Sequence, residues 1–313
     1  MDIIKITDID GFLIGNAEKI DSGTGVTTII SKSGATPGVD VRGGSPGTRE
    51  TDLIASEETI DKIHSVVLAG GSAFGLDAAS GVMTFLEEKD IGFDTGYGKV
   101  PIVSSAIIFD LDYKGSKVRP DKNMGYLSAQ NAFKNNYKDG PLGVGAGATI
   151  GKILGYEASM KSGVGSFAIK INNLEIGAII GLNALGSIYE NNTLIGGPIL
   201  DGKVQDTFSL LVQGFKGGFP SNTTIGAVLT NGDITKAQAN KVASSAHNGL
   251  ARSIKPVHTS MDGDTLFVLS SNKVKADINV IQSLSAYVVE KAVINAFKSV
   301  ASDDHLKCFN DFK

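Results

Sequence analysis

Asn222-Thr223-Thr224-Ile225-Gly226-Ala227-Val228-Leu229 is the most informative stretch of the chain. Its apolar residues predict a strand that begins directly after a Gly-, Pro- and Ser-containing loop at residues 217–221. If the Asn222–Thr223 bond broke, Thr223 would become a new N-terminus at the start of this strand. Its α-amine would then act as general base for its own Oγ. Because an α-amine titrates near pH ~8, part of it is free base at neutral pH.

Strands and helices alternate on both sides of this stretch. A hairpin around Asn172-Asn173 favours an α+β or mixed α/β architecture over a purely parallel sheet. The predicted strands are Gly25–Ser31, Ser65–Ala69, Ala106–Leu111, Ser166–Ile171, Leu174–Leu182, Thr224–Thr230 and Asp264–Ser270. Four helices are predicted. The first ends near Glu88, the next two span Asn123–Lys134 and Thr235–Ile254, and the last follows the N-cap candidate Asp277.

The composition is that of an ordinary globular protein: 313 residues, 42% hydrophobic and 20% charged. A net charge of −4 and the lack of a Lys/Arg cluster argue against a nucleic-acid partner. The single Cys308 precludes an internal disulfide and suits a reducing compartment. No signal-peptide pattern follows Met1, and no apolar run approaches the ~20 residues of a membrane span. We therefore expect a cytoplasmic protein with no membrane partner.

Gly-rich segments match known motifs only in part. Ser72 follows Gly70-Gly71, but Phe74 stands where a nucleophile elbow requires Gly, so a tight turn whose helix N-terminal amides face a cleft is predicted. The segment Gly143–Ala148 follows a turn rather than a strand, which argues against a dinucleotide site. Lys152 lies just beyond it, either as a surface lysine or as a cation within a site.

Asp262 and Asp264 lie two residues apart at the entrance of a predicted strand, so their side chains are expected to project the same way. Paired carboxylates can orient an ammonium, share a proton or bind a metal, although the spacing alone favours a polar turn. The histidines lack metal-ligand spacing and are expected to be surface or hydrogen-bonded structural residues: His64, His247, His258 and His305.

Five segments in order carry a resemblance that covers nearly the whole chain. They resemble the self-processing L-aminopeptidase/D-esterase family of N-terminal nucleophile hydrolases, which includes β-aminopeptidases and nylon-oligomer hydrolases. The segments are Val39-Asp40-Val41-Arg42-Gly43-Gly44, Leu68-Ala69-Gly70-Gly71-Ser72-Ala73-Phe74-Gly75-Leu76, Arg119-Pro120-Asp121-Lys122, Asn222-Thr223-Thr224-Ile225 and Pro256-Val257-His258-Thr259-Ser260-Met261-Asp262-Gly263-Asp264-Thr265-Leu266-Phe267.

The resemblance implies a four-layer αββα sandwich formed by one domain of residues 1–313. It also implies a precursor that cuts itself between Asn222 and Thr223 into residues 1–222 and 223–313. Thr223 would then be the nucleophile, and its α-amine the base. Relatives of this kind assemble as homo-oligomers, so a tetramer is expected.

The family pattern also implies roles for other residues. Asn183 matches an Asn placed for the oxyanion, Lys152 an active-site Lys, and Asp262 with Asp264 a carboxylate pair near the nucleophile. Where the family has a Tyr this chain has Phe109, which lacks the phenolic donor for a second oxyanion hydrogen bond. Phe109 and Ser72 are expected to line the substrate pocket.

The resemblance and the residues together predict an aminopeptidase or amidohydrolase acting on small peptides or aminoacyl amides through an acyl-enzyme. No metal and no organic cofactor is implied. Two alternatives stay open. A related acyltransferase would pass the acyl group to an amine instead of water, and an unprocessed, non-catalytic binding protein would keep the same fold.

Overall fold

The computed structural model describes residues 1–215, 222–301 and 305–312, so the loop predicted at residues 217–221 lies outside the described residues. A single long strand, β3 (Thr24–Val41), belongs to two stacked sheets. Its residues 36–41 pair in one sheet and its residues 24–30 in the other. The register shifts between these halves, around Gly34, whose φ of 75° is a left-handed conformation that glycine adopts without strain.

The first sheet contains, in order, β1 (Asp2–Ile4), β11 (Val164–Ile171), β12 (Leu174–Asn183), β17 (Thr223–Gly232), β19 (Thr265–Val274) and the second half of β3. In the second sheet the first half of β3 lies between β2 (Leu13–Lys19) and β5 (Ile63–Ala69), followed by β8 (Val103–Ile107) and β4 (Thr48–Arg49). β17 and β19 are parallel, as are β5 and β8. Parallel neighbours need a crossover, and a helix supplies it in each case.

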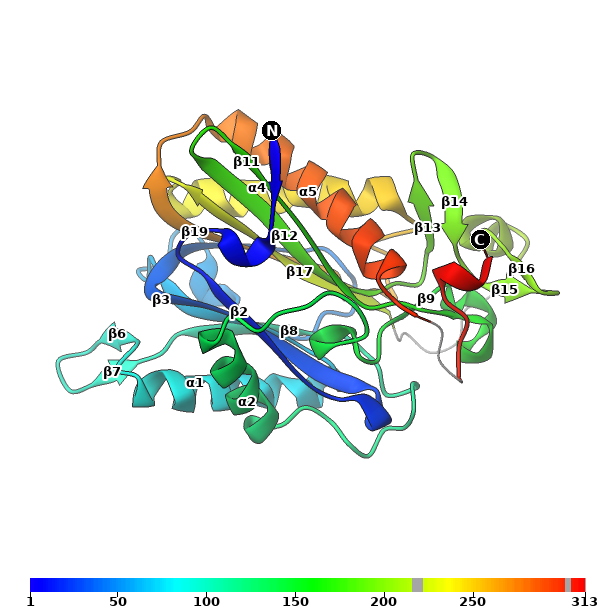
Figure 1. Ribbon diagram of the computed structural model, residues 1–313, viewed down its shortest axis with the longest axis horizontal. Helices are drawn as coiled ribbons and strands as arrows, with labels where there is room; N and C mark the ends of the chain where they lie inside the picture. The colour runs from blue at the N-terminus through cyan, green and yellow to red at the C-terminus, as the bar shows by residue number, and fades with distance from the viewer. Residues whose placement is uncertain (216–221, 302–304, 313) are drawn as a thin grey trace.

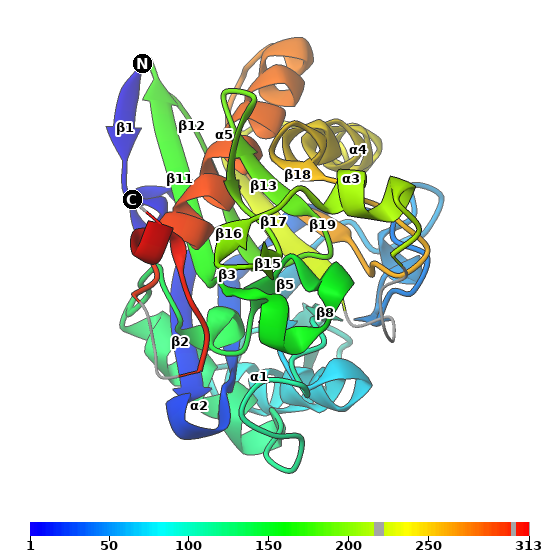
Figure 2. The same cartoon turned by 90° about the vertical axis from the view of Figure 1, so that its right-hand side faces the viewer.

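Helices cover the outer faces of both sheets (Figure 1). The first sheet is covered by α4 (Lys236–Ser253) and α5 (Ile278–Lys298), and the second by α1 (Ala78–Glu88) and α2 (Lys122–Phe133). Figure 2 shows the same layers turned by 90°, together with the short helix α3 (Thr207–Val212). This arrangement confirms the expected mixed α/β, four-layer αββα sandwich.

Each interface between layers is apolar. Between α4, α5 and the first sheet lie Ile180, Val228, Val242, Leu250, Val289 and Phe297. Between the two sheets lie Ile29, Val66, Leu68, Ile179, Ala227, Leu229 and Phe267. Between the second sheet and α1 and α2 lie Val26, Val67, Val82, Phe85 and Ala129. β17 therefore has apolar packing on both faces, and all of its residues are buried.

Side-chain caps and a tight turn define several element ends, and those at Asp277 and Asn172 were predicted. Thr235 caps α4 in a capping box with Gln238, as its Oγ1 accepts the Gln238 N–H and its own N–H donates to Gln238 Oε1. Asp277 caps α5 by accepting the Asn279 N–H at 2.7 Å. The predicted hairpin joins β11 and β12 through Asn172, whose φ is 52°.

The strand predicted over Ala106–Leu111 is wrong at its end, because β8 stops at Ile107. The chain leaves the sheet to place the Asp110 carboxylate inside the protein. That carboxylate accepts the Gly71 N–H at 2.6 Å and the Thr24 hydroxyl at 2.7 Å. Two fixed donors for a buried carboxylate therefore outweigh further strand pairing.

Among the described residues, no helix is long and apolar enough to cross a membrane. Short strands and 3₁₀ turns complete the described chain. The short strands are β6 (Phe93–Asp94), β7 (Lys99–Val100), β9 (Thr149–Ile150), β10 (Met160–Lys161), β13 (Ser187–Glu190), β14 (Thr193–Gly196), β15 (Ile199–Leu200), β16 (Lys203–Val204) and β18 (Ile254–Lys255). The 3₁₀ turns include η4 (Ser72–Asp77), η5 (Gly143–Gly145), η6 (Lys152–Leu154) and η8 (Phe309–Phe312).

Helix α5 packs closely enough on β11 to require glycine at position 165. A Cβ at Gly165 would lie 2.1 Å from the backbone nitrogen of Ala296. We predict that Gly165→Ala lowers the free energy of unfolding by about 1–3 kcal/mol, because the helix must move away from the sheet. Urea unfolding measures this change. Lys241→Ala, on the exposed face of α4, is the control and should change stability little; equal stability of both variants would contradict the close packing.

Candidate active site

Three strand ends meet at one end of the first sheet. Asn183, the last residue of β12, pairs directly with Thr223, the first residue of β17. On the other side of β17, Asn222 forms a parallel bridge with Asp262, just before β19. Sheet pairing thus brings together four of the predicted site residues, and all four are buried.

The hydroxyl of Thr223 faces the peptide bond that precedes it. Thr223 Oγ1 donates a hydrogen bond to the carbonyl oxygen of Asn222. The same oxygen accepts the N–H of Gly263 at 3.1 Å. A Cβ added to Gly263 would lie 2.9 Å from Thr223 Oγ1, so this position has little room for a side chain. In the uncut chain a hydroxyl, the adjoining carbonyl and an N–H donor to that carbonyl are therefore in contact.

Lys152 is buried, with 4% of its surface exposed, so the surface-lysine alternative is wrong. Its Nζ donates to Asn183 Oδ1 at 2.7 Å, and the Thr149 N–H donates to the same oxygen at 3.1 Å. Asn183 Nδ2 donates to the carbonyl oxygen of Phe109 at 2.9 Å. These bonds fix the amide of Asn183, with its oxygen toward Lys152 and its nitrogen toward Phe109.

Burial lowers the pKa of Lys152 from 10.5 to about 8, while the carboxylates of Asp112, Asp110 and Asp262 act in the opposite direction. With a pKa near 8, Lys152 is mostly cationic at neutral pH. Burial also raises the pKa of Asp110 to about 6. Sequence reasoning did not single out Asp110 or Asp112, because the folded chain alone brings them to the lysine.

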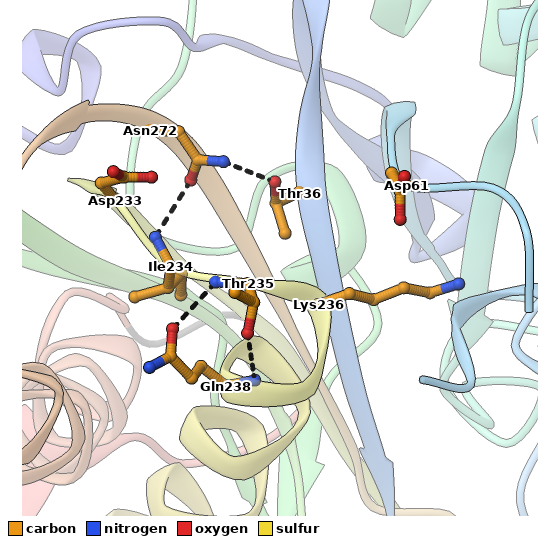
Figure 3. Close-up of a pocket in the computed structure, with 8 residues that line it drawn as sticks. All are labelled: Thr36, Asp61, Asp233, Ile234, Thr235, Lys236, Gln238 and Asn272. Carbon is orange, nitrogen blue, oxygen red and sulfur yellow. Dashed lines mark hydrogen bonds between the residues drawn. The ribbon is translucent and has the colours of Figure 1, made fainter. Parts of the chain in front are cut away.

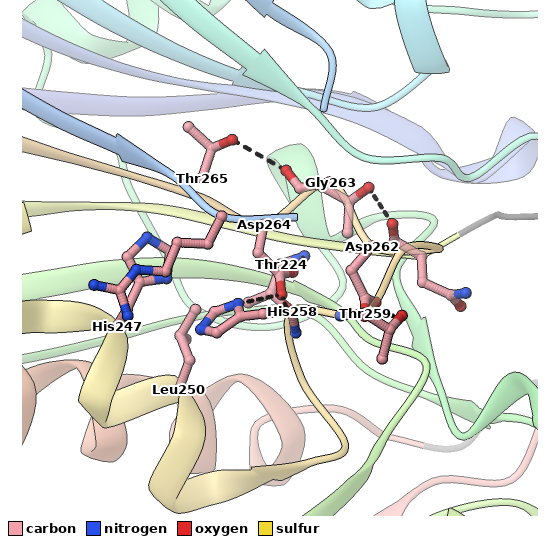
Figure 4. A network of polar contacts seen from close by, with 12 residues as sticks. Thr224, His247, Leu250, His258, Thr259, Asp262, Gly263, Asp264 and Thr265 are labelled. Atoms are coloured by element: carbon pink, nitrogen blue, oxygen red, sulfur yellow. Dashed lines mark hydrogen bonds and ion pairs between the residues drawn. The ribbon is translucent and has the colours of Figure 1, made fainter. Parts of the chain in front are cut away.

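Asp264 connects the start of β17 to a histidine (Figure 4). Its Oδ1 accepts the N–H of Thr224 at 2.7 Å. Its Oδ2 accepts the backbone N–H of His258 at 3.0 Å and meets His258 Nδ1 at 2.8 Å. The carboxylate is 1% exposed, so these donors replace the water that it loses on burial.

Asp262 takes different partners from Asp264. Its Oδ2 accepts both the N–H and the hydroxyl of Thr259, at 2.8 and 2.6 Å. Burial, followed by the charge of Asp264, raises its pKa to about 6. Asp262 also acts on the pKa of Lys152. Asp262 and Asp264 both precede β19, which begins at Thr265, and each carboxylate has its own hydrogen-bond donors.

A glycine loop after β3 holds the segment that carries both carboxylates. A Cβ at Gly43 would lie 2.2 Å from the Asp262 carbonyl oxygen, so glycine is required there. The Ser45 N–H donates to the Asp262 carbonyl at 2.9 Å, and the Arg42 N–H to the Asp264 carbonyl at 2.9 Å. Sequence reasoning gave this loop no role at the site, although Arg42-Gly43-Gly44 lies within a segment that carries the family resemblance.

Ser72 and Phe109 lie on neighbouring segments. The Ser72 N–H donates to the Ile108 carbonyl at 3.0 Å. Gly71 and Ser72 have φ values of 81° and 54°, which confirms the predicted tight turn at this position. Phe109 meets Asn183 through its backbone carbonyl, so this contact is the same whichever side chain stands at position 109.

A cavity of about 470 Å³ lies at the opposite end of β17 from Thr223 (Figure 3). Residues at the start of α4 line it, among them Lys236, whose Nζ donates to the Glu58 carbonyl at 2.9 Å. None of the predicted site residues lines it, so it is separate from the candidate site. Among the described residues, no group of three or more His, Cys, Asp or Glu side chains is arranged to hold a metal ion.

A family model described as Peptidase family S58 matches residues 5–304. The chain belongs to peptidase family S58. An uncharacterised aminopeptidase of Mycobacterium leprae is 38% identical to this S58 chain over 294 residues, which are 87% of this chain and 80% of the relative. A 6-aminohexanoate-oligomer endohydrolase of Agromyces is 31% identical over 279 residues, which are 85% of this chain and 75% of the relative.

Solved structures share the fold of the S58 chain. An L-aminopeptidase D-Ala-esterase/amidase from Ochrobactrum anthropi, described as a prototype for the serine aminopeptidases and a variant of the Ntn hydrolase fold, superposes with a TM-score of 0.66 at 18% identity, covering 94% of this chain and 86% of that chain. A Burkholderia β-aminopeptidase gives 0.65 at 16% identity, covering 97% and 88%. The S58 peptidase therefore has the expected N-terminal nucleophile hydrolase fold, and its family places it among the aminopeptidases and amidohydrolases.

We predict that Asp112→Asn lowers the pKa of Lys152 in the S58 chain below about 8, because it removes a carboxylate that favours the ammonium. Lysine-selective ¹³C NMR measures the titration, in a Thr223→Val background that keeps the 222–223 bond intact. Asp94→Asn, in the hairpin of β6 and β7, is the control and should leave the pKa of Lys152 unchanged. The same pKa in both variants would contradict the proximity of Asp112 to Lys152.

Proposed function

We propose that this chain is a self-processing N-terminal-threonine amidohydrolase. One domain of residues 1–313 would cut itself into residues 1–222 and 223–313 and act as a homo-tetramer, as the family resemblance implies. The observation that carries the proposal is the contact between Thr223 Oγ1 and the Asn222 carbonyl oxygen, which also accepts the Gly263 N–H. This contact supports the proposal because it brings the Thr223 hydroxyl to the peptide group that would be cut.

In the processing step, Thr223 Oγ bonds to the carbonyl carbon of Asn222 and the C–N bond between the two residues breaks. The hydroxyl proton passes to the departing nitrogen, which leaves an ester and a free α-amine. Water then hydrolyses the ester, freeing the carboxylate of Asn222 and the hydroxyl of Thr223. The Gly263 N–H is placed where negative charge develops on the carbonyl oxygen, and a donor of this kind contributes about 10²–10³ in rate.

In each turnover, the α-amine of Thr223 accepts the proton while Oγ attacks the substrate amide. The acyl group is transferred to Oγ, the amine product leaves, and water releases the acid. We assign stabilisation of the oxyanion to Asn183, whose amide nitrogen the lysine contact orients. Lys152 favours the neutral α-amine by charge repulsion, and the pair Asp262 and Asp264 orients that amine or a substrate ammonium.

Small peptides or aminoacyl amides are the proposed substrates. One relative is named an aminopeptidase and another a 6-aminohexanoate-oligomer endohydrolase. Both names describe enzymes that cleave amide bonds between amino acids. Three carboxylates, Asp110, Asp112 and Asp262, act on the charge of Lys152. This excess of negative charge suits a substrate that carries an ammonium group. The mechanism uses no metal and no organic cofactor.

Neighbouring threonines provide a matched test of processing. Thr223→Val removes the nucleophile with little change in shape, so we predict a single chain of full length. Thr224→Val is the control, since Thr224 Oγ1 is buried without a hydrogen-bond partner in the described structure. This variant should still cut, and N-terminal sequencing of its small fragment should give threonine, valine and isoleucine in the first three cycles.

Cleavage of Thr223→Val would overturn the assignment of the nucleophile. An uncut wild-type chain that leaves aminoacyl p-nitroanilides intact would instead favour the non-catalytic binding protein. Transfer of the acyl group to an added amine in preference to water would favour the acyltransferase.

The charges beside Thr223 predict how the rate depends on pH. The value of kcat/KM should rise with pH as the α-amine loses its proton, near pH ~8 when unperturbed. Asp262, with a pKa of about 6, is mostly ionised there and stabilises the ammonium. Asp262→Asn should therefore move the ascending limb to lower pH, and Lys152→Met should move it to higher pH. The profiles are measured on processed material only. An unmoved limb in both variants would show that neither charge lies beside the amine.

A further inference from the structure

We propose that His258 is a positioning residue that holds the Asp264 carboxylate against the N–H of Thr224 and thereby fixes the nucleophile, Thr223. The inference rests on the proposed function. The backbone N–H and the ring Nδ1 of His258 both bind the Asp264 carboxylate. His258 acts through Asp264, which is the shared partner of the histidine and of the strand start.

The two oxygens of Asp264 have separate tasks. Oδ1 accepts the Thr224 N–H at 2.7 Å, and Oδ2 is held by the backbone N–H and the ring Nδ1 of His258 at 3.0 and 2.8 Å. The Thr224 N–H belongs to the peptide that follows Thr223, so its direction sets the orientation of the Thr223 backbone. Loss of the histidine donor would allow the carboxylate to rotate and release this peptide.

The backbone of His258 is itself constrained. Its φ of 59° is left-handed, which costs a residue with a Cβ roughly 1 kcal/mol or more. In this conformation both its N–H and its ring nitrogen reach the same oxygen of Asp264. Residues held in such sparsely populated conformations concentrate at functional sites, because the surrounding contacts must repay the strain.

The surroundings of the ring fix its tautomer. A carboxylate only accepts, so His258 Nδ1 carries the proton. The other ring nitrogen is buried without a hydrogen-bond partner in the described structure, and the ring packs edge to face on His247 at 4.7 Å. Burial lowers the pKa of His247 to about 4, so this neighbour is neutral at pH 7. On its other side, His247 Nε2 donates to the backbone carbonyl of Asp40 at 2.9 Å. Arg42 forms an ion pair with the Asp40 carboxylate.

The network crosses the proposed cleavage site. Asp40 and Arg42 lie in residues 1–222, whereas His247, His258 and Asp264 lie in residues 223–313. The positioning contacts themselves join His258, Asp264 and Thr224, which all lie in residues 223–313, so the proposed cut leaves them intact. Once the chain is cut, Thr223 has lost its covalent link to Asn222. The hydrogen bond from the Thr224 N–H to Asp264 then restrains its orientation, together with the pairing to Asn183. We expect the histidine to influence kcat more than KM.

Two variants of nearly equal shape separate the donor from the ring. Asn and Asp both tolerate a positive φ. In His258→Asn, the side-chain NH₂ replaces Nδ1 as a donor to Asp264, so processing and kcat should stay within about threefold of wild type. His258→Asp offers no donor and adds a like charge, so kcat should fall about 10- to 100-fold with KM within about twofold, since small misplacements of reacting groups cost up to about 10² in rate.

His258→Gly and His247→Gln complete the series. His258→Gly removes the donor without strain at positive φ and without added charge. Its kcat should fall as predicted for His258→Asp, so it replaces that variant if His258→Asp is too unstable to assay. His247→Gln retains a donor for the Asp40 carbonyl and leaves every hydrogen bond of Asp264 in place, so its kcat should lie much closer to wild type than that of His258→Asp. Thermal unfolding of each variant shows whether the chain is folded at the assay temperature.

Equal, near-wild-type kcat values for the Asn, Asp and Gly variants at position 258 would overturn the proposal, as would an equal large loss in all three, because the donor would then not matter. A failure of the proposed function is distinguishable. In that case the wild-type chain itself neither cuts at Asn222–Thr223 nor hydrolyses an amide, whatever stands at position 258.

Discussion

The register of β17 between β12 and β19 is the constraint on which the rest of the site depends. Its antiparallel pairing with β12 sets Thr223 opposite Asn183, and its parallel pairing with β19 places Asp262 and Asp264 beside the same end. Because both faces of β17 are packed in apolar layers, a slip of one residue would exchange the two faces along the whole strand. The cores on either side of the sheet therefore also fix the position of Thr223.

Buried charge is the cost of this arrangement. The shift of the Lys152 pKa from 10.5 to about 8 corresponds to roughly 3 kcal/mol against the charged form in the folded chain. This cost is present below pH about 8 and fades as the pH rises toward 10.5, where the unfolded chain loses the same proton. The hydrogen bond to Asn183 and the nearby carboxylates keep the ammonium charged at neutral pH. Stability is thus given up at the place where the proposed chemistry needs a cation.

Short-range preferences predicted much of the fold. The N-cap of α5 at Asp277, the turn at Asn172 and the start of β17 at Thr223 each depend on a few neighbouring residues. The environment of Lys152 was not predictable in this way, because Asn183 and the carboxylates reach it through sheet pairing and loop packing. His258 was expected to be a surface or hydrogen-bonded structural histidine. Its bond to Asp264 requires a left-handed backbone that no local pattern indicates.

The central claim is that the Thr223 hydroxyl is the nucleophile at the end of β17. The most direct measurement is to quench the purified protein during turnover of an activated aminoacyl ester and to locate the trapped acyl group by mass spectrometry. The account predicts a fragment of residues 223–313 that is heavier by one acyl group, with the added mass mapped to Thr223. An acyl group on an uncut chain, or on another hydroxyl such as that of Ser72, would contradict it.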